Sequence, residues 1–334
     1  MLRWAILGTS FISETIAQAI QEVEDCIISA VASRSLEKAK EFATKHCIEK
    51  FYSSYDEIIK DNDVDVVYIG LPNHLHAEWS IKCARAGKHI LCEKPFTVNA
   101  FEAIKALEII KENNVFFMEA QMYRCHPQTL KLVELIKEDG IGKVMSFNAV
   151  FSDKISQFEN LTAGGSILNL GCYPLSLIRL LAGAALNTDL AEPSEIIGQS
   201  IIDFTKNYDQ QSLAILKFEN GMMANILVSD EFGLTSSFKI YGEKGFIEVN
   251  NPWLAQKEND IYIQSYHDFE RHRVAVKSDL SLYATEIDRV KSCIQQKIKE
   301  APLPAMTFND SLNNMYALDK WRDAVKLKYP IELV

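Results

Sequence analysis

The sequence predicts two joined fold classes, α/β and then α+β. Residues 1–120 are expected to form a Rossmann domain, a doubly wound parallel sheet, and residues 121–334 a large, mainly antiparallel sheet covered on one face by helices. The length of 334 residues exceeds one typical hydrophobic core. Short apolar runs alternate with helical patterns in the first part, whereas they follow one another through tight turns in the second.

The first 120 residues have the rhythm of β-α-β units. Their apolar runs lack strict alternation because a parallel strand between two helix layers is apolar on both faces. Ligands bind such sheets at the carboxyl ends of the strands. The expected strands lie at residues 3–7, 26–33, 64–70, 88–93 and 114–120.

The second part changes to antiparallel patterns. A long apolar helix near residues 163–183 is expected to cover one face of the sheet, and helices at 279–299 and 309–327 can pack back on the first domain. The other face stays uncovered, which predicts a homodimer or homotetramer through this sheet. A helix is expected at 123–140, strands at 143–152, 212–220, 222–230, 236–250 and 260–266, and hairpin turns at 218–222 and 241–246.

Charge and cysteine usage restrict the partners and the compartment. A net charge of -10 disfavours nucleic acid as the main partner. Seven cysteines without a C-x-x-C pair, and no visible signal peptide, predict a cytoplasmic protein. The apolar stretch 167–186 contains Asn169, Pro174 and Arg179, so we interpret it as a buried helix and expect no membrane partner.

The segment "GTSFIS" follows the first expected strand and precedes a helix. Gly8 permits the tight turn, and the small Ser10 and Ser13 stand where a dinucleotide-binding turn has its second and third glycines. A plain strand-turn-helix without a ligand is the alternative. The turn residues that we expect to bind the cofactor are Gly8, Thr9, Ser10, Phe11 and Ile12.

The end of the second strand indicates which dinucleotide binds. A carboxylate usually holds the adenosine ribose about twenty residues beyond the glycine motif, but the chain has Ser33 and Arg34 there. A hydroxyl and a guanidinium can bind a 2′-phosphate, so NADP is favoured, with NAD possible. Alternatively, Arg34 is only a solvated residue at a strand end.

The most specific segment is "GLPNHLHAEWSIKCARAGKHILCEKP" at residues 70–95. It resembles the signature of the glucose-fructose oxidoreductase, inositol dehydrogenase and rhizopine-catabolism (Gfo/Idh/MocA) family. "MYRCHP" at 122–127 and "GGSILNLGCYP" at 164–174 extend the similarity over nearly the whole chain, closest to the branch of dimeric dihydrodiol and D-xylose dehydrogenases.

The resemblance implies further cofactor-binding residues around the nicotinamide. In the family the Lys94–Pro95 bond is commonly cis, which would turn Lys94 into the cleft. An exposed lysine after an edge strand is the alternative, and His76 could equally cap a helix or pack. The cofactor-binding residues that the resemblance implies here are Leu71, Pro72, Asn73, His76, Glu93, Lys94 and Arg124.

Tyr173 is the second chemical candidate implied by the resemblance. Asn169 and Tyr173 share a face if their segment is helical. Tyr173 would take a hydroxyl proton as base while Lys94 holds the oxygen, although Tyr173 could also be a core tyrosine. Much of the family has Asp where this chain has Asn169, and an amide cannot accept a proton. We treat Lys94, Tyr173 and Asn169 as the catalytic candidates.

These patterns predict an NADP-dependent dehydrogenase or reductase acting on a sugar, cyclic polyol or diol. The alternative is a cofactor-binding regulator or sensor that keeps the fold without catalysis, for which Asn169 is the best support. No metal site is predicted, because His74 and His76 are only two residues apart and no Cys or Asp cluster accompanies them.

Overall fold

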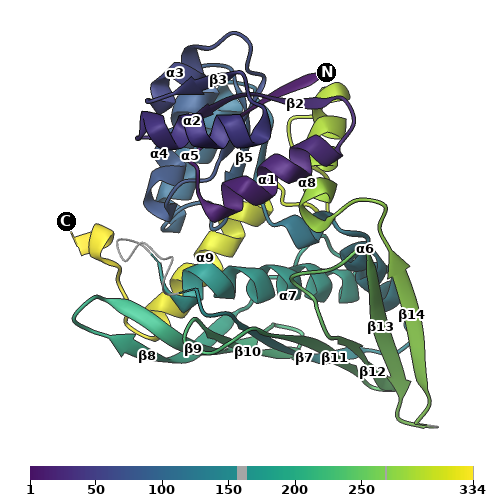
Figure 1. The fold of residues 1–334 in the computed structure, drawn as a ribbon. Coiled ribbons are helices and arrows are strands. Elements are labelled where there is room, and N and C mark those ends of the chain that lie inside the picture. The colour runs from purple at the N-terminus through teal and green to yellow at the C-terminus, as the bar shows by residue number, and fades with distance from the viewer. Residues whose placement is uncertain (156–163, 268, 334) are drawn as a thin grey trace. The chain divides into compact units, whose positions relative to one another are not determined.

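The computed structural model describes residues 1–155, 164–267 and 269–333 (Figure 1). It contains two compact units, which we describe separately. The first comprises Met1–Thr97, Phe101–Met122 and Leu280–Ser311, and the second comprises Val98–Ala100, Tyr123–Asp279 and Leu312–Val334.

The first unit is built on a six-stranded parallel sheet in the order β3-β2-β1-β4-β5-β6. This arrangement confirms the predicted doubly wound sheet. The five expected strands are present, whereas β3 was not predicted because it has only three residues, too few to show a pattern. The strands are β1 Leu2–Leu7, β2 Cys26–Ala32, β3 Lys50–Tyr52, β4 Val66–Ile69, β5 His89–Glu93 and β6 Phe117–Ala120.

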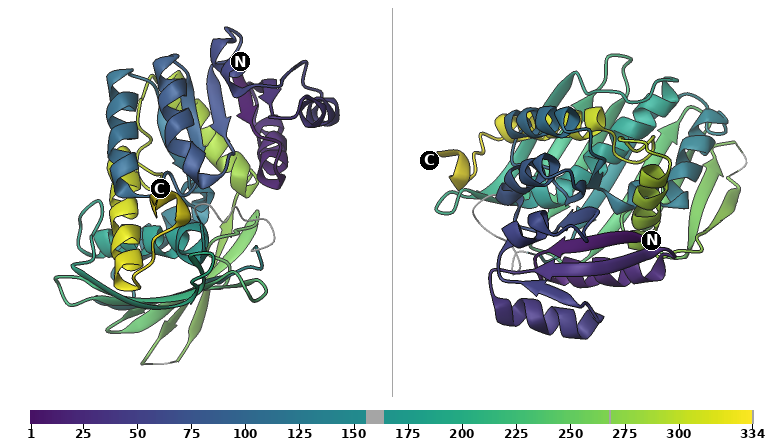
Figure 2. Two further views of the ribbon diagram at one scale, coloured as in Figure 1. Left: turned by 90° about the vertical axis from the view of Figure 1, so that its left-hand side faces the viewer. Right: turned by 90° about the horizontal axis from the view of Figure 1, so that it is seen from above.

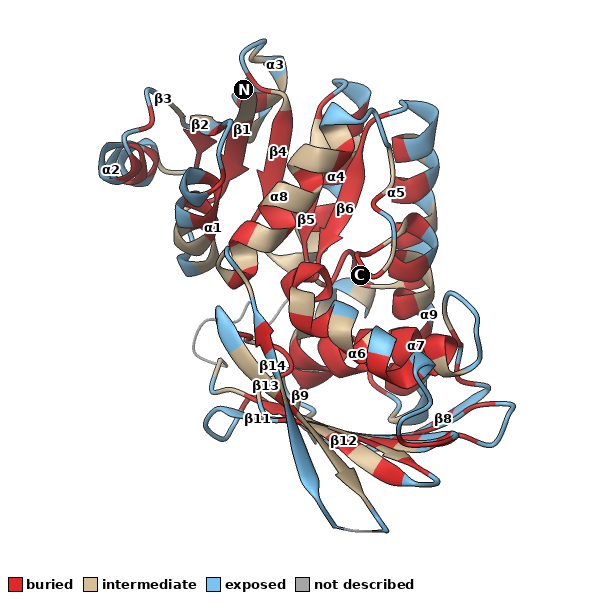
Figure 3. Cartoon of the chain, turned by 90° about the vertical axis from the view of Figure 1, so that its right-hand side faces the viewer, coloured by how far each residue is buried: buried red, intermediate tan, exposed pale blue. Residues whose placement is uncertain are grey.

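Helices cover both faces of this sheet. In β1 from Trp4 onward and throughout β4, successive side chains on the two faces are therefore all buried. The helix α8 lies beside α1 on one face of this sheet (Figure 3), where the Ser281 N–H donates to the Glu22 carboxylate at 3.0 Å. The helices of this unit are α1 Phe11–Glu22, α2 Leu36–His46, α3 Tyr55–Lys60, η1 Asn73–Leu75, α4 His76–Arg85, α5 Ala100–Glu112 except for Ala100 itself, and α8 Leu282–Gln295.

The second unit is built on an eight-stranded sheet in the order β14-β13-β12-β11-β7-β10-β9-β8. Neighbouring strands are antiparallel except β7 and β10, and β9–β10 and β11–β12 are the expected hairpins. Two edge strands were not predicted, β8 because Gly198 interrupts it and β14 because it is largely charged. The strands are β7 Val144–Ser152, β8 Glu195–Asp203, β9 Tyr208–Lys217, β10 Met223–Ser229, β11 Thr235–Gly242, β12 Gly245–Val249, β13 Glu258–Ser265 and β14 Arg271–Lys277.

One face of this sheet is covered by an apolar helix (Figure 1 and Figure 2). It starts as a π-helix at Ile167–Gly171 and continues as α7 at Cys172–Ala185. The helix is long and apolar enough to span a membrane by length and composition, but 94% of the apolar window is buried inside the protein. The predicted buried helix is therefore confirmed. The other helical elements are η2 Met122–Cys125, α6 Pro127–Lys137, α9 Phe308–Ala324 and η5 Pro330–Leu333.

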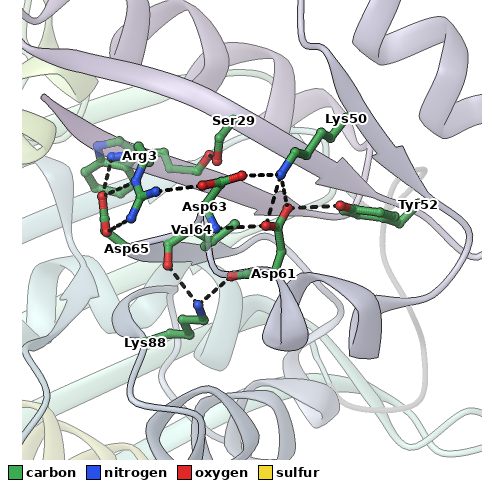
Figure 4. A network of polar contacts seen from close by, with 10 residues as sticks. Arg3, Ser29, Lys50, Tyr52, Asp61, Asp63, Val64, Asp65 and Lys88 are labelled. Atoms are coloured by element: carbon green, nitrogen blue, oxygen red, sulfur yellow. Dashed lines mark hydrogen bonds and ion pairs between the residues drawn. The ribbon is translucent and has the colours of Figure 1, made fainter.

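An ionic network joins the amino ends of the parallel strands (Figure 4). The Arg3 guanidinium donates to the Asp65 carboxylate at 2.9 and 2.7 Å, and the Lys50 ammonium donates to the Asp61 carboxylate at 3.0 Å. The Lys88 ammonium donates to the carbonyl oxygens of residues 61 and 64 at 2.6 and 2.8 Å. These bonds stabilise the edge of the sheet opposite to the strand ends where ligands bind in this fold class.

The Arg3–Asp65 pair predicts a pH-dependent stability. Hydrogen bonds from Arg3 hold the pKa of Asp65 below its ordinary value, so the stabilisation is present above the unfolded pKa of about 3.9 and is lost as the pH falls through the folded value. Because both side chains are about one-third exposed, we expect Asp65→Asn to lower the free energy of unfolding by about 1 kcal/mol at pH 7.

Urea denaturation at pH 7, 4 and 3, followed by circular dichroism, measures this difference. The difference between wild type and Asp65→Asn should shrink at the acidic values. Asp189→Asn, at an exposed turn, is the matched control. A difference that is the same at all three pH values would contradict the ion-pair explanation.

Candidate functional site

The turn after β1 brings two backbones into contact. Gly8 has a φ of +98°, and a Cβ there would lie 2.7 Å from the carbonyl oxygen of Gly70, directly after β4. Ser10 precedes α1 as its N-cap residue without a side-chain capping bond, and its hydroxyl lies 3.1 Å from that of Ser13. The first N–H groups of α1 therefore have no side-chain cap and remain for a ligand such as a phosphate.

The end of β2 lies beside this turn. The Thr9 hydroxyl donates to the Ser33 hydroxyl at 3.5 Å, and the Ser35 N–H donates to the same oxygen at 3.4 Å. Ser33 is buried, whereas Arg34 is exposed. Burial raises the pKa of Tyr55, and the Arg34 charge, together with hydrogen bonding to Arg34, opposes this rise. The structure thus brings the Thr9 and Ser33 hydroxyls together. The guanidinium of Arg34 belongs to the next residue in the chain.

His76 connects the loop after β4 to the turn at Lys94–Pro95 directly after β5, which we call the corner. One ring nitrogen of His76 lies 2.8 Å from the Pro95 carbonyl oxygen and the other lies 2.7 Å from the Leu71 carbonyl oxygen. Burial lowers the pKa of His76 to about 4, while the hydrogen bonds to the two carbonyl oxygens act in the opposite direction. His76 therefore connects the Pro72–Asn73 loop to the corner.

The two remaining candidates of the turn after β1 lie in the first turn of α1. Phe11 is exposed and Ile12 is half-buried.

The corner itself contains the candidate lysine. The Lys94–Pro95 peptide is cis, and Lys94 is half-buried. Buried Glu93 accepts hydrogen bonds from the Tyr68 hydroxyl at 2.8 Å and from the Lys94 N–H at 3.2 Å. Burial raises the pKa of Glu93, while the Lys94 charge acts in the opposite direction.

Two buried carboxyls near this corner were not predicted from the sequence. Glu119 accepts a hydrogen bond from the Phe96 N–H at 3.1 Å, and burial raises its pKa to about 7. Glu286 on α8 is fully buried, interacts electrostatically with Glu93, and has neither oxygen paired within the described residues. The available signal was a charged residue at an apolar position, Glu119 within an apolar strand and Glu286 on the apolar face of a helix.

The second unit holds the other candidates. Asn169 lies in the π-helix and Tyr173 in the first turn of α7, so the segment is helical across both residues, as their spacing requires. The Tyr123 hydroxyl donates to the Tyr173 carbonyl oxygen at 2.9 Å, and the Tyr173 ring stacks on Tyr123 and meets the Phe151 ring edge-on. Tyr173 is only 6% exposed, which fixes its ring.

Arg124 also belongs to the second unit. Its guanidinium is fully buried and donates to the Ser176 hydroxyl and, at 3.3 Å, to the Ser176 carbonyl oxygen on α7. These bonds connect η2 to the helix that carries Tyr173. Within residues 1–155, 164–267 and 269–333, no group of three or more His, Cys, Asp or Glu side chains could hold a metal ion.

The fold and the turn at Gly8 define a Rossmann protein with a dinucleotide-type phosphate cradle. Residues 2–121 match the model of the "Oxidoreductase family, NAD-binding Rossmann fold", and residues 129–248 match the "GFO/IDH/MocA C-terminal domain". The chain belongs to the GFO/IDH/MocA family of oxidoreductases, as the motifs predicted.

Relatives of known name agree with this assignment. The chain is 28% identical to trans-1,2-dihydrobenzene-1,2-diol dehydrogenase of Bos taurus over 98% of each chain. It is 31% identical to D-xylose 1-dehydrogenase (NADP(+)) 2 of Haloferax volcanii over 75% of this chain and 76% of that protein. The fold matches that of KijD10, a 3-ketoreductase from Actinomadura kijaniata, with a TM-score of 0.87, 23% identity and coverage of 97% of this chain and 98% of the other.

Proposed function

We propose that this oxidoreductase is NADP-dependent and transfers hydride between nicotinamide and a sugar, cyclic polyol or diol, or the corresponding carbonyl compound. One observation carries the proposal: Gly8, the Ser33–Arg34 pair and Lys94 all follow carboxyl ends of strands in one parallel sheet. Doubly wound sheets bind dinucleotides at this edge. The names of the dihydrodiol and D-xylose dehydrogenases support the substrate class.

The residues of the turn fit a dinucleotide. The tight approach of Gly8 to Gly70 leaves no space for a Cβ, and the uncapped start of α1 offers backbone N–H groups to a pyrophosphate. Arg34 would bind the 2′-phosphate, and Glu93 and Lys94 would contact the nicotinamide end. NADP supplies or accepts the hydride when it is bound.

The protein's own residues would handle the proton and the oxygen. In the proposed mechanism Tyr173 takes the proton of the substrate hydroxyl during oxidation and returns it during reduction. The Lys94 ammonium donates a hydrogen bond to the same oxygen and stabilises its developing negative charge. Asn169 would orient a substrate hydroxyl through its amide, which donates and accepts hydrogen bonds but takes no proton.

The roles of Lys94 and Tyr173 predict a loss of turnover. We expect Lys94→Met and Tyr173→Phe each to reduce kcat by about 10²- to 10⁴-fold, because each removes a group that acts on the reacting oxygen. The measurement is reduced nicotinamide formation with a panel of aldoses, diols and inositols. Lys320→Met and Tyr316→Phe, both on the exposed side of α9, are matched controls.

No turnover of any substrate by wild type, together with tight dinucleotide binding, would instead support the regulatory alternative. Asn169 is the observation that favours this second function, since much of the family has Asp there. If wild type turns over a substrate and both variants keep its rate, the assigned catalytic roles are wrong.

The preference for NADP depends on Arg34. We expect Arg34→Ala to weaken NADP binding about 10- to 100-fold and to leave NAD binding unchanged, because a charge-assisted hydrogen bond contributes about 1.5 to 3 kcal/mol. Isothermal titration with both dinucleotides measures the two affinities. Arg85→Ala, at the exposed end of α4, is the control. Equal effects on NADP and NAD would refute a 2′-phosphate contact.

We further propose a homodimer or homotetramer formed through the uncovered face of the eight-stranded sheet. Adjacent strands present exposed apolar side chains on this face, and Ile197 on β8 pairs directly with Ile215 on β9. Contiguous apolar surface of this kind marks association sites. Its residues include Ile197 (53% exposed), Leu213 (47%), Ile215 (43%) and Met223 (48%). The seven cysteines, which all lie within the described residues, are thiols rather than disulfides, and this supports a reducing, cytoplasmic compartment.

If the chains associate through this face, a charged side chain introduced on it should break the oligomer. We expect Ile215→Glu to dissociate the assembly into single chains, because the interface would bury a carboxylate without a partner. Light scattering coupled to size-exclusion chromatography measures the mass. Leu36→Glu, an exposed apolar position on α2, is the control. An unchanged oligomer with Ile215→Glu would exclude this face.

A further inference from the structure

A buried carboxylate fixes the amino end of the helix that carries Asn169 and Tyr173. Asp209 on β9 is fully buried and accepts hydrogen bonds from the Ser166 hydroxyl at 2.8 Å and from the Ile167 N–H at 2.7 Å. A Cβ on Gly165 would lie 1.9 Å from an Asp209 oxygen, so the backbone is pressed against the carboxylate. The π-helix therefore starts at a position defined by Asp209.

The C-terminal tail provides a further partner of Asp209. The Tyr329 hydroxyl donates to Asp209 at 2.7 Å, and Tyr329 is itself fully buried. In the same tail Glu332 accepts a hydrogen bond from the Tyr329 N–H at 3.0 Å and pairs with the Arg322 guanidinium of α9. Arg322 is 4% exposed, so water hardly competes for this pair.

The other end of this chain of bonds lies just after the corner that contains Lys94. Asn99 and Ala100 follow Lys94 by five and six residues and belong to the second unit. The Asn99 side-chain amide donates to Glu332 at 3.2 Å, and the Ala100 N–H donates to Asp319 at 2.8 Å. Arg322 connects the two carboxylates, since it also donates to Asp319 at 2.6 Å.

We propose that the C-terminal tail is a positioning device for the active site, with Tyr329 and Asp209 as positioning residues. The bonds run from Asn99–Ala100 through the tail to Asp209 and hold the start of the π-helix in one place. Helix and sheet are close-packed, so a displacement at Ser166–Ile167 is transmitted to Asn169 and Tyr173 rather than absorbed locally. The inference rests on the proposed roles of Asn169 and Tyr173.

Tyr329→Phe tests the proposal with the least disturbance, because it removes only the hydroxyl that reaches Asp209. Asp209→Asn is the second variant and Tyr316→Phe, a half-exposed tyrosine on α9, is the matched control. In the full-length protein we expect kcat to fall about 10- to 100-fold in both variants, since a misplacement of about 1 Å can cost a hundredfold. KM for the dinucleotide should stay unchanged, because the turn at Gly8 belongs to the first unit.

Hydrogen exchange gives a readout that does not depend on activity. The amides of residues 166–173 should exchange faster in Tyr329→Phe and Asp209→Asn than in wild type or Tyr316→Phe, because the Ile167 N–H loses its fixed acceptor geometry. A double variant should lose no more activity than either single variant if both residues act through one contact.

The outcomes separate the two proposals. If the amides of residues 166–173 exchange faster in the two variants but the wild type turns over no substrate, the positioning role of the tail is supported and the catalytic function is rejected. A lower melting temperature with unchanged kcat and unchanged exchange at 166–173 would show a purely structural tail and overturn the inference.

Discussion

The close approach of Gly8 to Gly70 is the constraint on which the first unit depends. A Cβ at Gly8 would meet the Gly70 carbonyl oxygen at 2.7 Å, so the turn after β1 and the loop after β4 can touch only as bare backbone. The parallel pairing of β1 with β4 puts both strand ends at one edge, where this contact leaves the start of α1 without a side-chain cap. Serine at positions 10 and 13 is compatible with it, because the positive φ is required only at Gly8.

Buried carboxyls perform a similar task in both units. Glu93 accepts the Lys94 N–H, Glu119 accepts the Phe96 N–H, and Asp209 accepts the Ile167 N–H, at 3.2, 3.1 and 2.7 Å. A buried carboxyl without a partner is costly, so each one favours the backbone geometry in which it accepts this bond. The segments held in this way are those with the candidate residues. These segments are thus held in place by hydrogen bonds to buried carboxyls, whereas the strands around them are stabilised by the burial of apolar side chains.

Sequence patterns revealed the elements whose burial is regular. The apolar runs of β1, β4 and β5 and the hairpin at residues 241–246 could be recognised because burial on both faces, or a tight turn, leaves a strong local signal. The short strand β3 and the edge strands β8 and β14 could not, since few residues or one solvated side weakens the pattern. The π-helix at Ile167 was expected only as a helix, because an extra residue in one turn does not change the apolar composition.

The sequence by itself determined the fold class, the family and the candidate residues, because glycine, E-K-P and strand-end positions are local features with direct backbone consequences. Only the tertiary structure decided which polar groups surround them. Asp209 lies more than thirty residues from Tyr173, and Tyr329 more than a hundred residues beyond that. Their hydrogen bond at 2.7 Å exists because the eight-stranded sheet and the C-terminal tail fold over the same helix start. Such long-range pairing leaves no periodic signal in the chain.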